Sequence, residues 1–204
     1  MQRERNMSPR HAQRGFTMVE IAVAMTVLAL MLFVAMPSIG TWLDNTRVRN
    51  TADSIQNGLQ IARGEAVRRN QSVSFWLVAI DDPGRLDNGC TLSATSGSWV
   101  VSVNSPLANC GQPPSTTESP MLVTGQAIGD GRPVTIAAVQ SDATAATSVT
   151  FDGFGRVTGT GSITRIDLNG SSTRNLRIEI SNAGAIRMCD RDVTVDTDPR
   201  RCST

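Results

Sequence analysis

The sequence contains no lysine and no tyrosine, and its single histidine, His11, lies near the N-terminus. Beyond residue 11 the chain therefore lacks the residues for a serine–histidine pair, a Schiff-base lysine or a histidine-ligated metal. Carboxylates remain, but Asp81 and Asp82 stand in a segment with Pro and Gly, which is typical of a solvated turn. This inventory predicts a protein that is not an enzyme and that holds no cofactor.

Charge is also absent from residues 21–43, and an uncharged run of 23 residues predicts a membrane-spanning helix. One carboxylate, Glu20, stands at the head of this run. Because a charged side chain costs about 2.5–3.5 kcal/mol at mid-bilayer, and less near the interface, Glu20 needs a partner. Residues 1–15 carry a net charge of +3, which favours a cytoplasmic N-terminus. They include Arg3, Arg5, Arg10 and Arg14 against Glu4.

The stretch from Arg14 to Glu20, which reads RGFTMVE, resembles the processing site of type IV pilins and of the pseudopilins of type II secretion. The resemblance implies that a prepilin peptidase cuts after Gly15 and that Phe16 becomes the N-methylated first residue. It also implies that Glu20 meets the N-terminal ammonium of a neighbouring subunit during assembly. An ordinary signal peptide carries its cleavage site after the apolar run, and a plain membrane anchor explains neither Gly15 nor Glu20.

Apolar residues recur at alternating steps of four and three after the uncharged run, which predicts that the helix continues with one apolar face. These residues are Val48, Ala52, Ile55, Leu59, Ala62 and Ala66. We expect one helix from about Phe16 to Arg69, bent at Pro37, because an interior proline removes a backbone hydrogen bond. An ordinary membrane helix with a proline kink explains this bend as well as a pilin-type helix does, so the bend by itself indicates no function.

From residue 72 the hydrophobic period changes to two, and short apolar stretches separated by turn residues predict β-strands. The predicted strands cover residues 72–80, 99–103, 133–139, 148–151, 162–168, 174–180 and 185–188. Asn182, Ala183 and Gly184 supply the turn of a hairpin between the last two. The predicted fold class is α+β and pilin-like: a long N-terminal membrane-spanning α-helix whose amphipathic half packs on a C-terminal antiparallel β-sheet domain.

Four later stretches are similar to the minor pseudopilins of the GspH/FimT family. They are residues 59–68 (LQIARGEAVR), 151–156 (FDGFGR), 181–189 (SNAGAIRMC) and 198–202 (DPRRC). The likeness is weak over residues 81–131, whose composition predicts a loop. Four segments are expected: a cytoplasmic leader (residues 1–15), a transmembrane and assembly helix (16–43), the periplasmic half of the helix (44–70) and a β-rich periplasmic domain (71–204).

The resemblance implies a single-pass inner-membrane protein that is incorporated near the tip of a periplasmic filament. Its expected partners are other minor and major pseudopilins or pilins, together with prepilin peptidase. We interpret the filament first as the pseudopilus of type II secretion. A type IV pilus is the alternative, and a pilin that binds DNA in natural transformation is less favoured.

The chain has four cysteines, Cys90, Cys110, Cys189 and Cys202. In an oxidising compartment they predict two disulfides, for which three pairings exist. We favour the pairing of neighbours, which closes two loops rich in turn residues and contributes about 3 kcal/mol for each loop. The spacing lacks the close cysteine pair with which a zinc site usually begins.

Two binding functions, calcium binding and DNA binding, are alternatives to the role of a filament subunit. The carboxylates of Asp190, Asp192, Asp196 and Asp198 are candidate calcium ligands, but they lack the ligand spacing and turn glycine of a calcium loop.

DNA binding is the other candidate, and its candidate contacts are Arg174, Arg177 and Arg187. Some FimT-type pilins bind DNA through a Gly-Arg-x-Arg motif, but residues 184–187 read GAIR here, so alanine replaces the first arginine. Residues 187–204 contain four Arg and four Asp, and the chain after residue 15 has 15 Arg against 17 acidic residues, a net charge of −2. DNA binding requires uncompensated positive charge, so we expect none.

Overall fold

The structure, a computed structural model, describes residues 15–129, 134–170 and 174–203, without the side chains of residues 34–39. The chain divides into two units, Met1–Gly40 and Thr41–Thr204, each of which is compact in itself. The predicted leader lies outside the described residues except for Gly15. So does the first residue, Pro133, of one predicted strand.

Helix α1 extends from Met18 to Arg69 and is assigned as helical through Pro37. The Thr17 hydroxyl oxygen accepts a hydrogen bond of 3.3 Å from the backbone N–H of Glu20, which caps the first turn. The predicted helix is thus confirmed to within two residues at its start. The side chains of residues 15–33 are all exposed.

A membrane span is expected to combine length with a high mean apolarity, and no helix in the described part of the chain meets both conditions. The predicted span at residues 16–43 is therefore not confirmed. It stays a prediction, as does the bend at Pro37.

In the second unit α1 ends in a Schellman arrangement. Asn70 adopts a left-handed φ of 48°, which asparagine tolerates better than most residues. The N–H of Asn70 donates to the carbonyl of Val67, and that of Gln71 donates to the carbonyl of Ala66. These two bonds satisfy carbonyls that the helix leaves free and stop it before the first strand.

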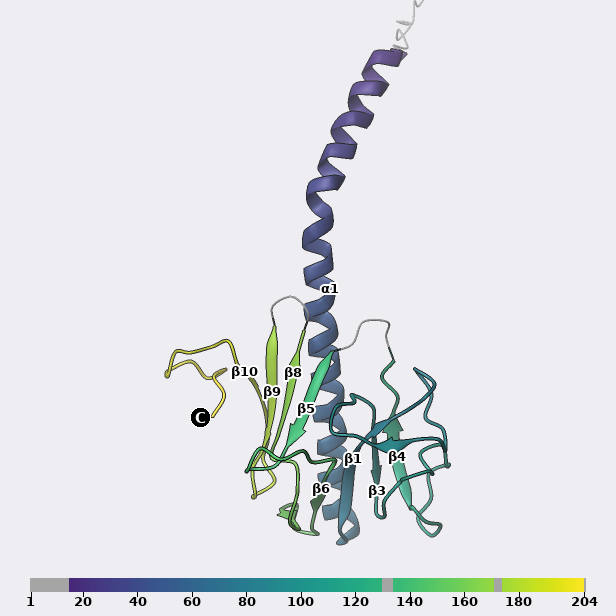
Figure 1. The fold of residues 1–204 in the computed structure, drawn as a ribbon, viewed down its shortest axis with the longest axis vertical. Coiled ribbons are helices and arrows are strands. Elements are labelled where there is room, and N and C mark those ends of the chain that lie inside the picture. Colours follow the sequence, from purple (N-terminus) through teal and green to yellow (C-terminus); the bar gives the residue numbers. More distant parts are fainter. Residues whose placement is uncertain (1–14, 130–133, 171–173, 204) are drawn as a thin grey trace, which may run out of the picture. The chain divides into compact units, whose positions relative to one another are not determined.

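The second unit contains two antiparallel sheets (Figure 1). The first has the order β4-β3-β1-β6-β7, with β2 paired to β1, and the second has the order β10-β9-β8-β5. The strands of the first sheet are β1 (Val73–Ala79), β2 (Thr91–Leu92), β3 (Trp99–Ser102), β4 (Leu122–Gln126), β6 (Ser148–Phe151) and β7 (Val157–Thr158). Those of the second are β5 (Thr135–Val139), β8 (Arg165–Asn169), β9 (Asn175–Ile180) and β10 (Ile186–Asp190).

Both sheets share one core with the C-terminal half of α1. The predicted apolar helix face is buried in full and includes Val48, Ala52, Ile55, Leu59, Ala62 and Ala66. It packs against Phe75 and Val149 of the first sheet and against Ile166 and Ile178 of the second. Burial of each large side chain contributes about 1.5–3 kcal/mol, so this shared core holds the two sheets on one helix.

A glycine sets how closely α1 approaches the first sheet. A Cβ atom at Gly58 would lie 2.8 Å from the rings of Phe75 and Trp99, whose centroids are 5.8 Å apart. The Trp99 indole N–H donates a 3.0 Å hydrogen bond to the Ser54 hydroxyl one turn earlier. Gly58 thus allows two large rings to lie directly against the helix backbone.

The predicted α+β class, a long helix packed on an antiparallel β-domain, is confirmed, and the seven predicted strands are confirmed with shifts of up to three residues at their ends; the short strand β7 was not predicted. Two expectations were wrong. The domain has two sheets where one was expected. Residues 81–131 were expected to form a loop apart from the strand at 99–103, yet they also contain β2 and β4. β4 was missed because Gly125 weakens its strand pattern; a Cβ there would lie 3.0 Å from the Trp99 carbonyl oxygen in β3.

The disulfides of the structure join neighbouring cysteines, as favoured from the sequence. Cys90 pairs with Cys110 across 20 residues, and Cys189 pairs with Cys202 across 13. The first bridge lies in a small second core with Val78, Val100 and Leu122. It therefore fixes the long segment around β2 to the first sheet.

Candidate functional site

The processing segment precedes α1 by very few residues. Gly15, Phe16 and Thr17 have no regular secondary structure, and the Phe16 side chain is 79% exposed. Nothing lies within 4 Å of the position that a Cβ would take at Gly15. In the described part of the chain, the predicted cleavage position is thus open on all sides.

Glu20 is the third residue of α1, and its side chain is exposed. A carboxylate in the first turn is favoured by the helix dipole, while the Thr17 hydroxyl satisfies the Glu20 backbone N–H. Among the described residues no ion pair involves the Glu20 carboxylate. The described part of the chain thus leaves this carboxylate without an ion-pair partner.

Charged residues also gather on one face of the second sheet, the face opposite the core. We call this the polar face; its residues alternate with the buried Ile166, Leu168, Leu176 and Ile178. The strand registers arrange it in two rows. One row consists of Arg187, Glu179, Arg165 and Val139, and the next consists of Cys189, Arg177, Asp167 and Ala137.

Ion pairs join most of the charges on the polar face. The Arg177 Nε donates to Asp167 at 2.6 Å, and this hydrogen bond raises the pKa of the Arg177 guanidinium. Arg187 lies 3.3 Å from a Glu179 carboxylate oxygen, and Arg191 lies 3.8 Å from Asp167. The two acids of the face are thereby shared among three arginines.

The C-terminal segment folds back onto this face. One Arg187 guanidinium nitrogen donates to the Arg201 carbonyl oxygen at 2.7 Å, and the Ser203 backbone N–H donates to Glu179 at 2.8 Å. The Cys189–Cys202 disulfide joins the segment covalently to β10. Glu179 therefore has both carboxylate oxygens engaged, one by Arg187 and one by Ser203.

Local ion pairs neutralise three more arginines of this region, Arg174, Arg200 and Arg201. Arg200 hydrogen-bonds Asp198 at 2.7 Å and lowers the pKa of that carboxyl to about 2. Arg201 lies 2.8 Å from Asp196. Arg174 lies 3.9 Å from Asp190, away from Arg177 and Arg187.

The four candidate calcium ligands do not converge. Asp190, Asp196 and Asp198 pair with three different arginines, and Asp192 accepts hydrogen bonds from the backbone and side chain of Asn175. Asp196 and Asp198 pair within the C-terminal segment, whereas Asp190 and Asp192 contact residues at the start of β9. This arrangement provides no oxygen cage for calcium among these four residues.

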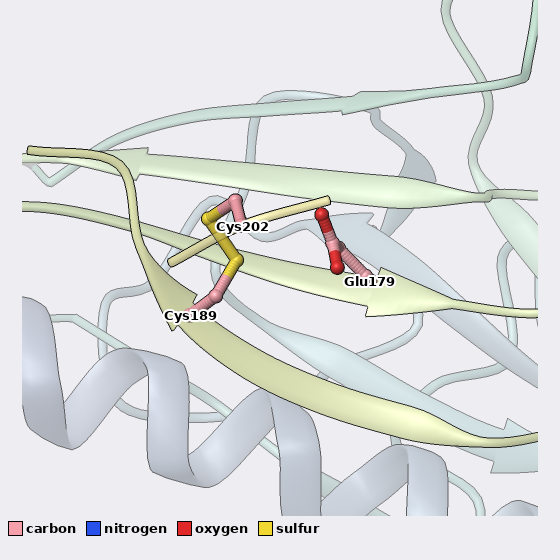
Figure 2. Close-up of side chains that lie close together, drawn as sticks. All are labelled: Glu179, Cys189 and Cys202. Carbon is pink, nitrogen blue, oxygen red and sulfur yellow. A yellow bond between two sulfur atoms is a disulfide. The ribbon is translucent and has the colours of Figure 1, made fainter. Parts of the chain in front are cut away.

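A different trio lies close enough to suggest a metal site. Figure 2 shows the Glu179 carboxylate beside Cys189 and Cys202. The two sulfur atoms are bonded to each other and so cannot act as thiolate ligands. The contact is instead part of the attachment of the C-terminal segment.

The structure brings together only part of the predicted DNA contact set. Arg177 and Arg187 share the polar face, whereas Arg174 pairs with Asp190 at the end of β10. Arg165, Asp167 and Glu179 were missed by the sequence reasoning. The alternation of residues 162–168 and 174–180 contained the signal, because antiparallel pairing about their turn places these residues opposite one another.

DNA binding is expected to be undetectable, because the three candidate DNA-contact arginines, Arg174, Arg177 and Arg187, are already paired with carboxylates. In detergent, the full chain should bind a labelled duplex no tighter than about 10⁻⁴ M at physiological salt. The double variant Asp167→Asn/Glu179→Gln removes two acids and keeps every arginine, so its affinity should rise. Micromolar binding by the wild-type chain, lost with added salt and with Arg187→Ala, would contradict this expectation.

Residues 10–36 match the family model described as the prokaryotic N-terminal methylation motif. Residues 51–184, which are most of the chain, match the family model described as type II transport protein GspH. The chain therefore belongs to the GspH family, a family of minor pilin and pseudopilin subunits rather than of enzymes. Comparison with curated proteins gives no match.

Two solved structures are similar to the chain, both of the type IV minor pilin FimU of Pseudomonas aeruginosa, in different crystal forms. One has 18% sequence identity and a TM-score of 0.40, and covers 72% of this chain and 91% of FimU. The other has 17% identity and a TM-score of 0.38, and covers 69% of this chain and 90% of FimU.

Proposed function

We propose that this chain is a non-catalytic minor pseudopilin that assembles near the tip of the periplasmic pseudopilus of a type II secretion system. The observation that carries the proposal is the open, charged start of α1, where a methylation motif precedes a helix that belongs to a GspH-family chain. A minor pilin of a type IV pilus is the second candidate, because the same subfamily resemblance covers both machines.

In this proposal a prepilin peptidase cuts after Gly15 and the new N-terminus at Phe16 is methylated. Residues 16–43 lie in the inner membrane before assembly and among the helices of neighbouring subunits afterwards. The exposed apolar side chains of residues 18–33 offer the surface for that packing, and small residues such as Ala22, Ala24 and Ala29 permit close approach. Glu20 pairs with the terminal ammonium of a neighbour.

Glu20 is the residue whose replacement tests this proposal. In cells that lack the gene, the wild-type chain should restore filament function, whereas Glu20→Ala should insert and fold but enter the filament about tenfold less. Loss of one charge-assisted contact of about 1.5 kcal/mol accounts for such a decrease. The quantities to measure are the chain in the sheared filament fraction, the secretion of the system's exoproteins and surface piliation.

Secretion and surface piliation together distinguish a type II secretion system from a type IV pilus. Loss of secretion with normal piliation supports the pseudopilus, and the reverse result supports a type IV pilus. Thr26→Ala, one helical turn and a half further on, is a matched control that keeps every charge. Normal filament incorporation of Glu20→Ala would show that the contact between Glu20 and the terminal ammonium of a neighbour is dispensable in this subunit.

A further inference from the structure

Arg165, the first residue of β8, is the one charged residue of the polar face that has no partner in the described part of the chain. Its neighbour in the register is Glu179 of β9, whose other neighbour is Arg187 of β10. Both oxygens of Glu179 are already engaged, by Arg187 and by the Ser203 backbone. Among the described residues no hydrogen bond or ion pair reaches the Arg165 guanidinium.

The Arg165 Nε atom is buried and has no hydrogen-bond acceptor. Buried donors are satisfied in the great majority of cases, since an unmade hydrogen bond leaves the cost of desolvation uncompensated. A guanidinium is also a fork of fixed geometry that matches a carboxylate. The described part of the chain therefore leaves this guanidinium without an acceptor.

A hollow of about 540 Å³ lies beside this arginine on the polar face. Its lining combines three arginines and one acid with apolar and small side chains, and includes Arg165, Arg177, Arg187, Glu179, Ile180 and Ala185. The polar face carries three arginines, at 165, 177 and 187, against the two acids Asp167 and Glu179, and Arg191, the residue after β10, adds a fourth arginine next to Asp167. The hollow is thus positive, and only one of its guanidinium groups is uncommitted.

We propose that this hollow receives an acidic side chain of another subunit of the same filament, with Arg165 as its anchor. The inference rests on the proposed function and names the chemistry of the partner. A single free guanidinium beside Ile180 and Ala185 suits one carboxylate flanked by an apolar residue. A DNA backbone instead requires several uncompensated cations in a row, and Arg177 and Arg187 are paired.

Binding of full chains in detergent tests the inference. The wild-type chain and three variants, Arg165→Ala, Arg165→Lys and Arg165→Glu, are titrated against each other minor subunit of the system. For one subunit we expect Arg165→Ala to raise Kd about tenfold, Arg165→Lys to raise it less, and Arg165→Glu to raise it most. Arg156→Ala is the matched control, because Arg156 is equally charged but pairs with Asp152 in the turn between β6 and β7.

The partner's acid is then identified by charge exchange. A photoreactive residue at Ser181, an exposed position in the lining, should cross-link to a segment of the partner that contains Asp or Glu. Changing that acid to arginine should weaken binding to the wild-type chain and restore binding to Arg165→Glu. Far-UV circular dichroism and thermal unfolding confirm that every variant is folded.

The outcomes separate this inference from the proposed function. Unchanged Kd values for all Arg165 variants, with the wild-type chain binding its partners, would overturn the inference and leave the proposed function in place. Failure of the wild-type chain to bind any subunit would overturn both. Duplex DNA bound with an affinity that depends on Arg165 would assign the hollow to phosphate and reject the carboxylate partner.

Discussion

Replacing Gly15 with valine is expected to abolish processing of the chain, so that the leader stays attached to all of it. The structure has room for the new side chain, since nothing lies within 4 Å of the Cβ position at Gly15. The effect therefore does not arise from misfolding of this chain. It arises at the peptidase, for which the resemblance to prepilins implies a requirement for glycine before the cut.

Intact mass spectrometry of the membrane-extracted chain measures this result. The wild-type chain should begin at methylated Phe16, and Gly15→Val should begin at the original N-terminus without methylation. Gly40→Val serves as the matched control, because Gly40 also has nothing within 4 Å but lies far from the cut. An unprocessed wild-type chain from cells with active prepilin peptidase would reject the proposed cleavage site.

Replacing Gly184 with alanine should give the largest loss of stability among single-methyl changes in the β-domain. Gly184 forms the β9–β10 turn with a φ of +80°, which costs other residues about 1–2 kcal/mol. Its new Cβ would also overlap the carbonyl oxygen of Gly155. That oxygen accepts a 3.1 Å hydrogen bond from Arg63 of α1, so displacing it disturbs the junction of helix and both sheets.

We expect Gly184→Ala to destabilise the protein by about 2–4 kcal/mol, the range of substitutions that strain the backbone and force neighbours apart. The midpoint of thermal unfolding should fall by about 6–12 °C for a domain of this size. Gly159→Ala is the matched control, with a φ of +87° but nothing within 4 Å of its Cβ position. Equal losses for the two variants would show that the contact with Gly155 contributes nothing.

The course of α1 was predictable from the sequence because its signals are local. The alternation of steps of four and three defines a single helix face, and all six of its residues are buried in the structure. The end at Arg69 was predictable to the residue, and Asn70, which tolerates a left-handed conformation, stops the helix there. The hairpin at Asn182–Gly184 was equally accessible, since its turn residues specify its geometry.

The division of the strands into two sheets was not predictable, because sheet membership depends on pairing between distant residues. β1 and β6 are separated by more than sixty residues yet pair directly, whereas β6 and β8 are close in sequence and lie in different sheets. β4 has a weak local pattern and exists because β3 offers it a partner. Context of this kind overrides β-propensity.

The candidate sites divide in the same way. The sequence by itself determined the processing motif, the position of Glu20, the apolar helix face and the balance of Arg and Asp near the C-terminus. These are properties of composition and short spacing. The tertiary structure alone decided which arginine pairs with which acid, because antiparallel register places residues from three strands on one face. It thereby left Arg165 without a partner among the described residues, since Glu179 lies between two arginines and its oxygens are engaged by Arg187 and Ser203.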